Sequence, residues 1–142
     1  MEMLPKTKDS PVIRTHFEDE AAWKKVCELI RQPQPDGAGG EFYAYVTFVN
    51  DPAFRDLAVQ ELLDRVPSDF GSFLMVVDKF TVRSPEYPIL VIDLNCRRGR
   101  TFRAIPAQIQ SIQNNLSIAN MDFAEFAEYV DEDGVFRGGG FT

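Results

Sequence analysis

SFLMVVD (residues 72–78) and ILVIDL (residues 89–94) decide the fold, because each is a continuous apolar run of strand length. Continuous runs of this kind are typical of strands that are covered on both faces. We therefore predict that both are central strands of a sheet. Arg97, Arg98 and Gly99 predict a turn into a further strand over residues 101–105, which would pair with the second run as an antiparallel hairpin.

Strand and helix patterns alternate before these runs. Residues 11–15 form a short β-prone run, and apolar side chains recur at helical spacing over residues 23–30, after a capping-box pattern at residues 15–18. Residues 41–50 predict one strand, since aromatic and β-branched side chains occupy both of its faces. Residues 51–66 predict a second helix, which opens with an aspartate followed by a proline.

After the central runs, the pattern becomes helical. Pro106 opens a third helix, and residues 123–130 carry the apolar stripe of a fourth. Pro85 and Pro88 argue against a regular helix between the two central strands. The order predicts an α/β fold in a single domain, a mixed four- to five-stranded sheet covered by about four helices with a C-terminal helix pair.

The length and composition bound the kind of protein. With 142 residues, 44% hydrophobic and 26% charged, the chain fits one globular domain and excludes a disordered one. We expect a flexible lead-in over residues 1–10, the domain over residues 11–137 and a flexible tail over residues 138–142. The acidic N-terminus lacks a signal-peptide pattern, which predicts a cytoplasmic protein.

The net charge of −7 disfavours binding to nucleic acid or anionic membranes and favours basic partners, although solubility explains the same charge. Cys27 and Cys96 form no CxxC pair, so neither a disulfide framework nor a zinc site is predicted. We expect no metal, no cofactor, and a monomer or small homo-oligomer. Cys96 lies beside two arginines, which would favour its thiolate.

Asparagines crowd the joint between the last two predicted helices, and this joint is the first candidate site. Asn114 or Asn115 can end one helix, and Asn120 or Asp122 can cap the next. Alternatively, the same side chains form a polar site for a small ligand or a peptide.

Basic side chains supply the other candidates. Four arginines lie between residues 97 and 103, where they suit anion recognition or a solvated turn. The leading hypothesis joins Arg103 and Arg14 to the asparagine-rich joint. His16 is the only histidine, and no nucleophile motif accompanies it, so we assign no catalytic residue.

Several segments carry a family resemblance. These are chiefly residues 114–123, NNLSIANMDF, and residues 133–138, DGVFRG, with shorter matches around Arg14 and Trp23 and over residues 91–94. Through them the chain resembles an uncharacterised family of small bacterial and fungal proteins, a domain of unknown function, over nearly its whole length. The resemblance implies a shared fold and supplies no mechanism.

Three functions follow from these observations. The first is a non-catalytic binding or interaction module for a protein or a small polar ligand, most concretely an acidic, immunity-like partner of a basic protein. The alternative is a small cofactor-free enzyme that uses Asp93 and Asp122 with Arg103 as an anion clamp. A third is a homo-oligomeric protein that assembles through residues 42–48.

Overall fold

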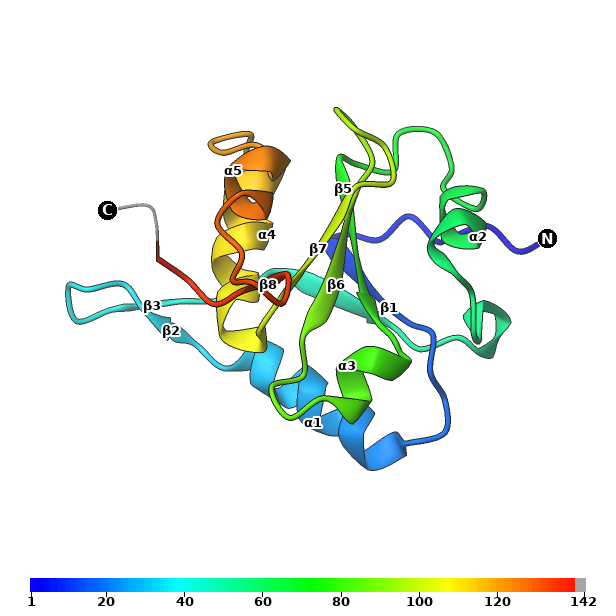
Figure 1. The fold of residues 1–142 in the computed structure, drawn as a ribbon, viewed down its shortest axis with the longest axis horizontal. Coiled ribbons are helices and arrows are strands. Elements are labelled where there is room, and N and C mark those ends of the chain that lie inside the picture. The colour runs from blue at the N-terminus through cyan, green and yellow to red at the C-terminus, as the bar shows by residue number, and fades with distance from the viewer. Residues whose placement is uncertain (140–142) are drawn as a thin grey trace.

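A six-stranded mixed sheet forms the centre of the molecule in a computed structural model, which describes residues 1–139 (Figure 1). Its strand order is β4-β1-β5-β6-β7-β8. The strands are β1 (Ser10–Arg14), β4 (Val46–Val49), β5 (Phe73–Val77), β6 (Ile89–Asp93), β7 (Thr101–Ala104) and β8 (Val135–Phe136). β1 runs parallel to β4 and β5, β6 is antiparallel to β5 and β7, and β8 is parallel to β7. The predicted α/β class is confirmed.

The two apolar runs are central strands, as predicted. All five residues of β5 and all five of β6 are buried, because each strand has other strands on both edges and a core on both faces. The hairpin of β6 and β7 is also present, with Ile92 opposite Thr101.

Helices cover both faces of the sheet. They are α1 (Glu20–Arg31), α2 (Val59–Leu63), α3 (Lys79–Arg83), α4 (Ile109–Ser117) and α5 (Phe123–Ala127), with 3-10 turns η1 (Pro52–Phe54) and η2 (Pro106–Gln108). One core cluster joins α1, α4 and α5 to the sheet. The other joins η1, α2 and the N-terminal residue Leu4 to the opposite face, so α2 lies across the sheet from α4 and α5 (Figure 1).

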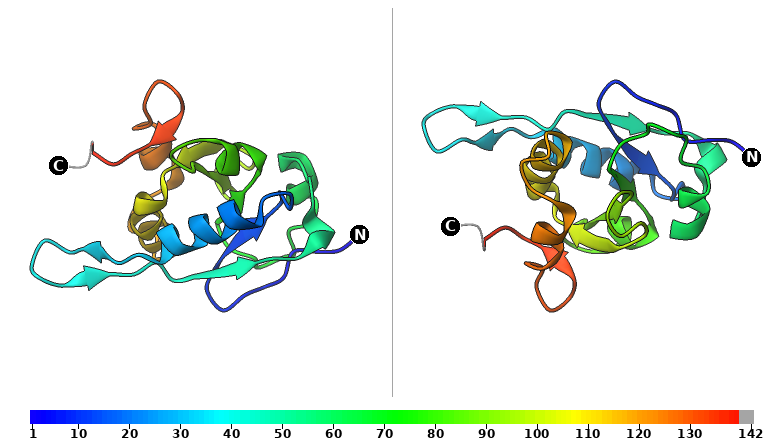
Figure 2. Two further views of the ribbon diagram at one scale, coloured as in Figure 1. Left: turned by 90° about the horizontal axis from the view of Figure 1, so that it is seen from below. Right: turned by 90° about the horizontal axis from the view of Figure 1, so that it is seen from above.

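The prediction of four to five strands in the sheet was too low because it missed β8. Residues 41–50, in addition, do not form one strand. β3 (Glu41–Phe42) pairs with β2 (Gln34–Pro35) in a separate two-stranded hairpin, which projects from the body of the molecule (Figure 2). The chain joins the main sheet only at β4. At Tyr45 the backbone N–H donates to Gln113 Oε1 at 3.1 Å instead of to a strand. The two-residue β8 carries too little pattern to be recognised.

The helix boundaries also differ from the predicted ones. Asp19 caps α1 by accepting from the Ala22 N–H, whereas Thr15, the predicted cap, extends the sheet by donating to Val77 O. The predicted second helix is split into η1 and α2. The proline argument against a helix before β6 was wrong, because α3 ends at Arg83 before Pro85 is reached.

The connections distinguish the two ends of the strands in the sheet. The crossover from β1 to β4 contains α1 on one face, and the crossover from β4 to β5 contains α2 on the other, so the connectivity reverses beside β1. We call the edge where β1, β4, β5 and β7 end the carboxyl edge, and the edge where they begin the amino edge. In open α/β sheets, ligands usually bind outside the carboxyl ends at such a reversal. Within residues 1–139 no helix is long and apolar enough to cross a bilayer.

The lead-in is anchored at one residue. Leu4 is 2% exposed within the second core cluster, and its N–H donates to Arg65 O at 2.8 Å. The predicted flexibility of residues 1–10 stays a prediction, and residues 140–142 of the predicted tail lie outside the described residues.

Truncation of Leu4 tests whether this anchor belongs to the cooperative fold. We expect Leu4→Ala to lower the free energy of unfolding by about 2–5 kcal/mol, because it leaves a cavity in the core. The matched control is Met3→Ala, an exposed neighbour, with an effect within about 0.5 kcal/mol. Equal effects of the two substitutions in urea denaturation would show that the lead-in does not contribute.

Candidate functional site

The predicted site residues do not form one cluster. Arg14 ends β1 and Arg103 lies in β7 near its end, both at the carboxyl edge. Asn114 and Asn115 belong to the last turns of α4, which runs back to the amino edge, and Asp122 caps α5 there. The structure therefore does not bring the two arginines together with the asparagine-rich joint, because they lie at opposite ends of the strands.

The Arg14 side chain is buried and bonded within the protein. It is 2% exposed, its Nε donates to His16 O, and its Nη1 donates to Glu20 Oε1 at 2.9 Å and to Asn50 Oδ1 at 3.2 Å. The guanidinium also lies 4.5 Å from the Phe17 ring centroid. Its Nη2 is buried without a hydrogen-bond partner in the part of the chain that the structure describes. Arg14 therefore ties β1 to β4 and α1 and is sealed from an external ligand.

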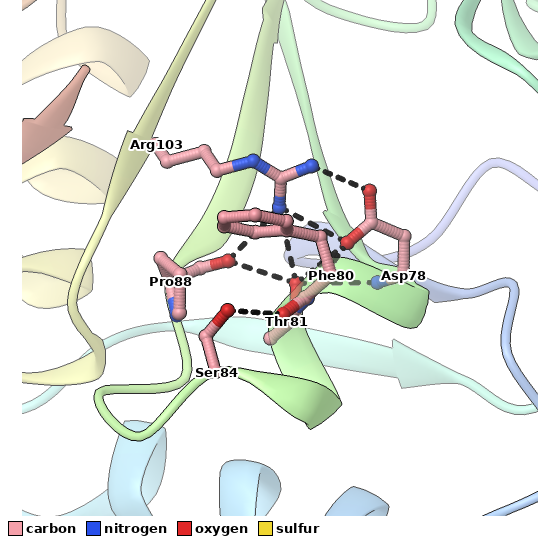
Figure 3. A network of polar contacts seen from close by, with 6 residues as sticks. All are labelled: Asp78, Phe80, Thr81, Ser84, Pro88 and Arg103. Atoms are coloured by element: carbon pink, nitrogen blue, oxygen red, sulfur yellow. Dashed lines mark hydrogen bonds and ion pairs between the residues drawn. The ribbon is translucent and has the colours of Figure 1, made fainter. Parts of the chain in front are cut away.

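Arg103 holds α3 against the sheet (Figure 3). Its Nη1 and Nη2 donate to Asp78 Oδ1 and Oδ2 at 3.0 and 2.7 Å, a two-pronged ion pair. Nη1 also donates to Pro88 O at 3.1 Å, and the Phe80 ring covers the guanidinium with its centroid 4.5 Å away. Thr81 Oγ1 completes the network by donating to Pro88 O. Arg103 thus joins three segments and has few donors left for an anion.

The Asp78 carboxyl group responds to two opposing influences. Burial is the largest and by itself raises the pKa of Asp78, but hydrogen bonds from Arg103 and from the Thr81 backbone N–H outweigh it. The pKa of Asp78 therefore lies below its usual value. The group is charged in the folded state and stabilises the fold.

A third arginine, Arg137, which the sequence analysis did not single out, also joins separate loops of the chain. Arg137 follows β8 and pairs with Glu86, Asp131 and Asp133 at 2.6 to 2.8 Å. These hydrogen bonds raise the pKa of Arg137 and lower the pKa values of Glu86 and Asp133. The clustering of acids before DGVFRG is the sequence signal that could have indicated this clasp.

The asparagine-rich joint is held mostly by its own amides. Asn115 Nδ2 donates to Ser111 O at 2.8 Å, and its Oδ1 accepts from Asn120 Nδ2 at 2.8 Å. Ala119 has φ of +56°, and the following N–H groups of Asn120 and Met121 donate to Asn115 O. Asp122 Oδ1 caps α5 by accepting from the Glu125 N–H. Asp122 therefore caps α5, one of the two predicted possibilities, whereas α4 ends differently from the prediction: Asn115 lies within the helix and the residue with positive φ is Ala119.

A cavity nevertheless opens beside this joint at the amino edge. It has a volume of about 270 Å³ and lies between the end of α4, the start of α5 and the turn after β6. We call it the corner cavity. Its polar lining includes Asp93, Asn95, Asn120, Asp122 and Glu125.

The charge of the corner cavity has one sign. Asp93, Asp122 and Glu125 contribute carboxylates, and no lysine or arginine lines the cavity. Asp93 is 2% exposed at its floor, where its two oxygens accept from the backbone N–H groups of Asn95 and Arg97. Asp122 and Glu125 are exposed at the rim. Leu116, Met121 and Phe123 add apolar wall.

Two further cavities adjoin the corner cavity. One, of about 260 Å³, shares Ser72 with it and reaches Lys6 and Lys8 of the lead-in. The other, of about 110 Å³, shares Asp93, Cys96, Asp122 and Phe123 with it and reaches Arg97 and Arg100. The amino edge therefore carries a groove that is acidic in the middle and has both charges at each end, since Asp9 and Asp69 line the first of these cavities and Glu128 lines the second.

The histidine and the cysteines do not complete a catalytic set. His16 is buried at the carboxyl edge, across the sheet from the groove. Cys96 is exposed and lines the corner cavity, while burial raises the pKa of the Cys27 thiol to about 11 and keeps it neutral. Within residues 1–139 no group of three or more histidine, cysteine, aspartate and glutamate side chains is placed to hold a metal ion.

One comparison with known proteins gives a match. The model of a family described as a domain of unknown function, DUF6924, matches residues 9–139. No curated protein matches the chain.

A double-mutant cycle tests the structural role of Arg103. We expect Asp78→Asn and Arg103→Gln to be coupled by about 1.5–3 kcal/mol of unfolding free energy, because each variant leaves a partly buried polar partner unpaired. The control cycle is Glu86→Gln with Arg137→Gln, an exposed pair with a smaller coupling. Coupling no larger than in that control would refute the role.

The lowered pKa of Asp78 predicts an acid-dependent contribution to stability. A carboxyl group with a depressed folded pKa stabilises fully above its ordinary pKa of 3.8 and loses this contribution as the pH falls through the folded value. The difference in unfolding free energy between the natural chain and Asp78→Asn should be constant above about pH 5 and shrink below 3.8. A difference that grows on acidification contradicts the assignment.

Proposed function

The chain belongs to the DUF6924 family, and from the geometry of its amino edge we propose that it is a non-catalytic binding module for a basic partner protein. The observation that carries this proposal is the corner cavity, a concave site with three carboxylates and no lysine or arginine in its lining. Such a site favours an inserted lysine or arginine side chain over a neutral or acidic one.

The walls of the corner cavity suit the two parts of such a side chain. Asp122 and Glu125 lie at the rim, and Leu116, Met121 and Phe123 offer apolar surface. Lysine and arginine combine a charged head with an aliphatic stem, which packs on apolar surface. Arginine fits better than lysine, because its planar guanidinium can donate to a carboxylate and to the Asn95 or Asn120 oxygen at once.

The net charge adds a long-range attraction to the binding of a basic partner. At −7 the chain attracts a basic protein before contact, and this attraction raises the association rate at low salt. An immunity-like protein that neutralises a basic partner is the most concrete form of the proposal. We propose a cytoplasmic setting, with which the free thiols of Cys27 and Cys96 are compatible.

The enzyme alternative has less geometric support. Asp93 and Asp122 do line the corner cavity together, but Arg103, its intended anion clamp, is bound to Asp78 at the opposite edge. Both oxygens of Asp93 already accept backbone N–H groups of the turn after β6. A binding module uses these carboxylates only as a source of negative potential, so the hydrogen bonds that Asp93 accepts do not conflict with that role.

Calorimetry with a small basic probe tests the proposal. The probe is a blocked tripeptide with a central arginine, compared with the same tripeptide that carries uncharged citrulline. We expect the arginine peptide to bind in the millimolar range, about −4 kcal/mol, and the citrulline peptide to bind at least about tenfold more weakly. Glu125→Lys should abolish the binding, because it places a cation at the cavity rim.

The matched control is Glu18→Lys, which makes the same charge change at an exposed position outside the corner cavity. It should leave arginine-peptide binding within about twofold of the natural chain, the small long-range effect of one remote charge. Equal binding of both peptides, or equal losses in both variants, would refute recognition at this cavity.

A further inference from the structure

We propose that a second cavity, between α1 and β4, receives a carboxylate side chain of an acidic polypeptide that adds as an extended strand to the open edge of β4. The cavity has a volume of about 290 Å³. It is lined by Trp23, Lys24, Cys27, Arg31, Phe48 and Asn50. We call it the α1–β4 cavity, and it is independent of the corner cavity.

The charge of the α1–β4 cavity is opposite to that of the molecule. On a chain with 22 acidic and 15 basic residues, its lining contains two cations and no carboxylate. Glu20 and Glu28 lie one helical turn from Lys24 on α1, but neither lines the cavity. The cavity therefore offers a local positive potential to an anionic group.

Neither cation is used inside the molecule. In the described part of the chain, Lys24 and Arg31 take part in none of the ion pairs, and both are exposed. The Arg31 guanidinium stacks 4.6 Å from the Phe48 ring centroid, which orients it while leaving its N–H groups free. This arrangement differs from that of Arg14, Arg103 and Arg137, each of which is bound to at least one carboxylate.

Asn50 adds a neutral donor at the end of the same cavity. Its Oδ1 accepts from Arg14 Nη1, which fixes the amide so that its Nδ2 points away from that bond. The buried Arg14 lies behind Asn50, but its charge is paired with Glu20, so the positive potential comes from the two cations of the lining. A carboxylate in the cavity would thus meet the Asn50 amide as well as these two cations.

The position of the α1–β4 cavity beside an edge strand selects the occupant. β4 pairs with β1 on one side only, and in the described residues no strand pairs with its other side. An added strand would satisfy the free backbone groups of β4 and would place alternate side chains on the α1 face. Phe48 lies on β4 and lines the cavity, so one of these side chains would enter it.

Exposed aromatic side chains extend the same surface along the chain. Phe42, Tyr43 and Tyr45, which lead into β4, are between 50% and 63% exposed. Aromatic residues contribute strongly to protein interfaces, and an added strand would give them an apolar contact. The favoured occupant therefore has acidic residues at alternate positions and β-branched residues between them.

The single tryptophan makes the proposal directly measurable. Trp23 is the only tryptophan of the chain and lines the α1–β4 cavity, so a change in its emission on peptide binding reports on the surroundings of that cavity. The probe is a blocked hexapeptide of alternating valine and glutamate, without aromatic residues. We expect a saturable change in Trp23 emission, and no change with the peptide that has glutamine in place of glutamate.

Two further experiments distinguish the contribution of the two cations to peptide binding from the contribution of strand pairing. The double variant Lys24→Glu with Arg31→Glu should lower the affinity for the glutamate peptide at least about tenfold. The control, Lys25→Glu with Arg83→Glu, makes the same charge change outside the cavity lining and should change this affinity less than about threefold. Thermal unfolding checks that both variants fold. A peptide with N-methyl groups on alternate residues should fail to bind the natural chain, because it cannot pair with β4.

Each remaining outcome overturns the proposal. Free glutamate or inorganic phosphate that binds as tightly as the peptide would make the cavity a small-anion site. Equal binding of the glutamine and glutamate peptides would show that the two cations do not recognise the carboxylate. Full binding of the N-methyl peptide would show that the peptide does not pair with β4. An unchanged Trp23 signal at millimolar peptide would show that the peptide does not bind in the α1–β4 cavity.

Discussion

The structure depends first on the apolar pairing of β5 with β6. All ten residues of these two strands are buried, so the pair contributes to the core on each face of the sheet. Their antiparallel contact also changes the direction of the sheet, from the parallel set of β4, β1 and β5 to the hairpin of β6 and β7. Because the two strands are almost entirely apolar, the polar side chains nearest to them, Asp78 and Asp93, lie where the strands end and turns begin.

The two edges use their polar residues differently. At the carboxyl edge, Arg14, Arg103 and Arg137 each join segments that lie apart in the chain, and the position where an α/β sheet often binds a ligand is occupied by the buried guanidinium of Arg14. At the amino edge, the joint between α4 and α5 satisfies its amides locally and leaves a cavity beside it. This contrast is the physical basis for assigning binding to the amino edge and the α1–β4 cavity.

The sequence was informative where a pattern had one physical cause. The central strands, the hairpin and the stripe of α1 could be predicted because burial alone explains them, and the capping role of Asp122 followed from residue type. The break within residues 41–50 could not, since the same alternation suits a projecting hairpin and a sheet strand. The supposed meeting of Arg103 with the asparagine-rich joint failed for a topological reason: α4 carries the chain back across the sheet, which no local spacing records. Lys24 and Arg31, which we propose to bind an anionic partner, could not be singled out from the sequence, because only the structure shows that they line one cavity and take part in none of the ion pairs of the described residues.

Amide hydrogen exchange with and without a basic partner peptide tests the central assignment most directly. The account predicts added protection in the turn after β6 and at the start of α5, around Asn95 and Asp122, which line the corner cavity. It predicts no change around Thr15 and Thr81, whose hydrogen bonds already close the carboxyl edge. Protection that appears at Thr15 and Thr81 instead, with the amino edge unchanged, would contradict the account and return the binding site to the ends of the parallel strands.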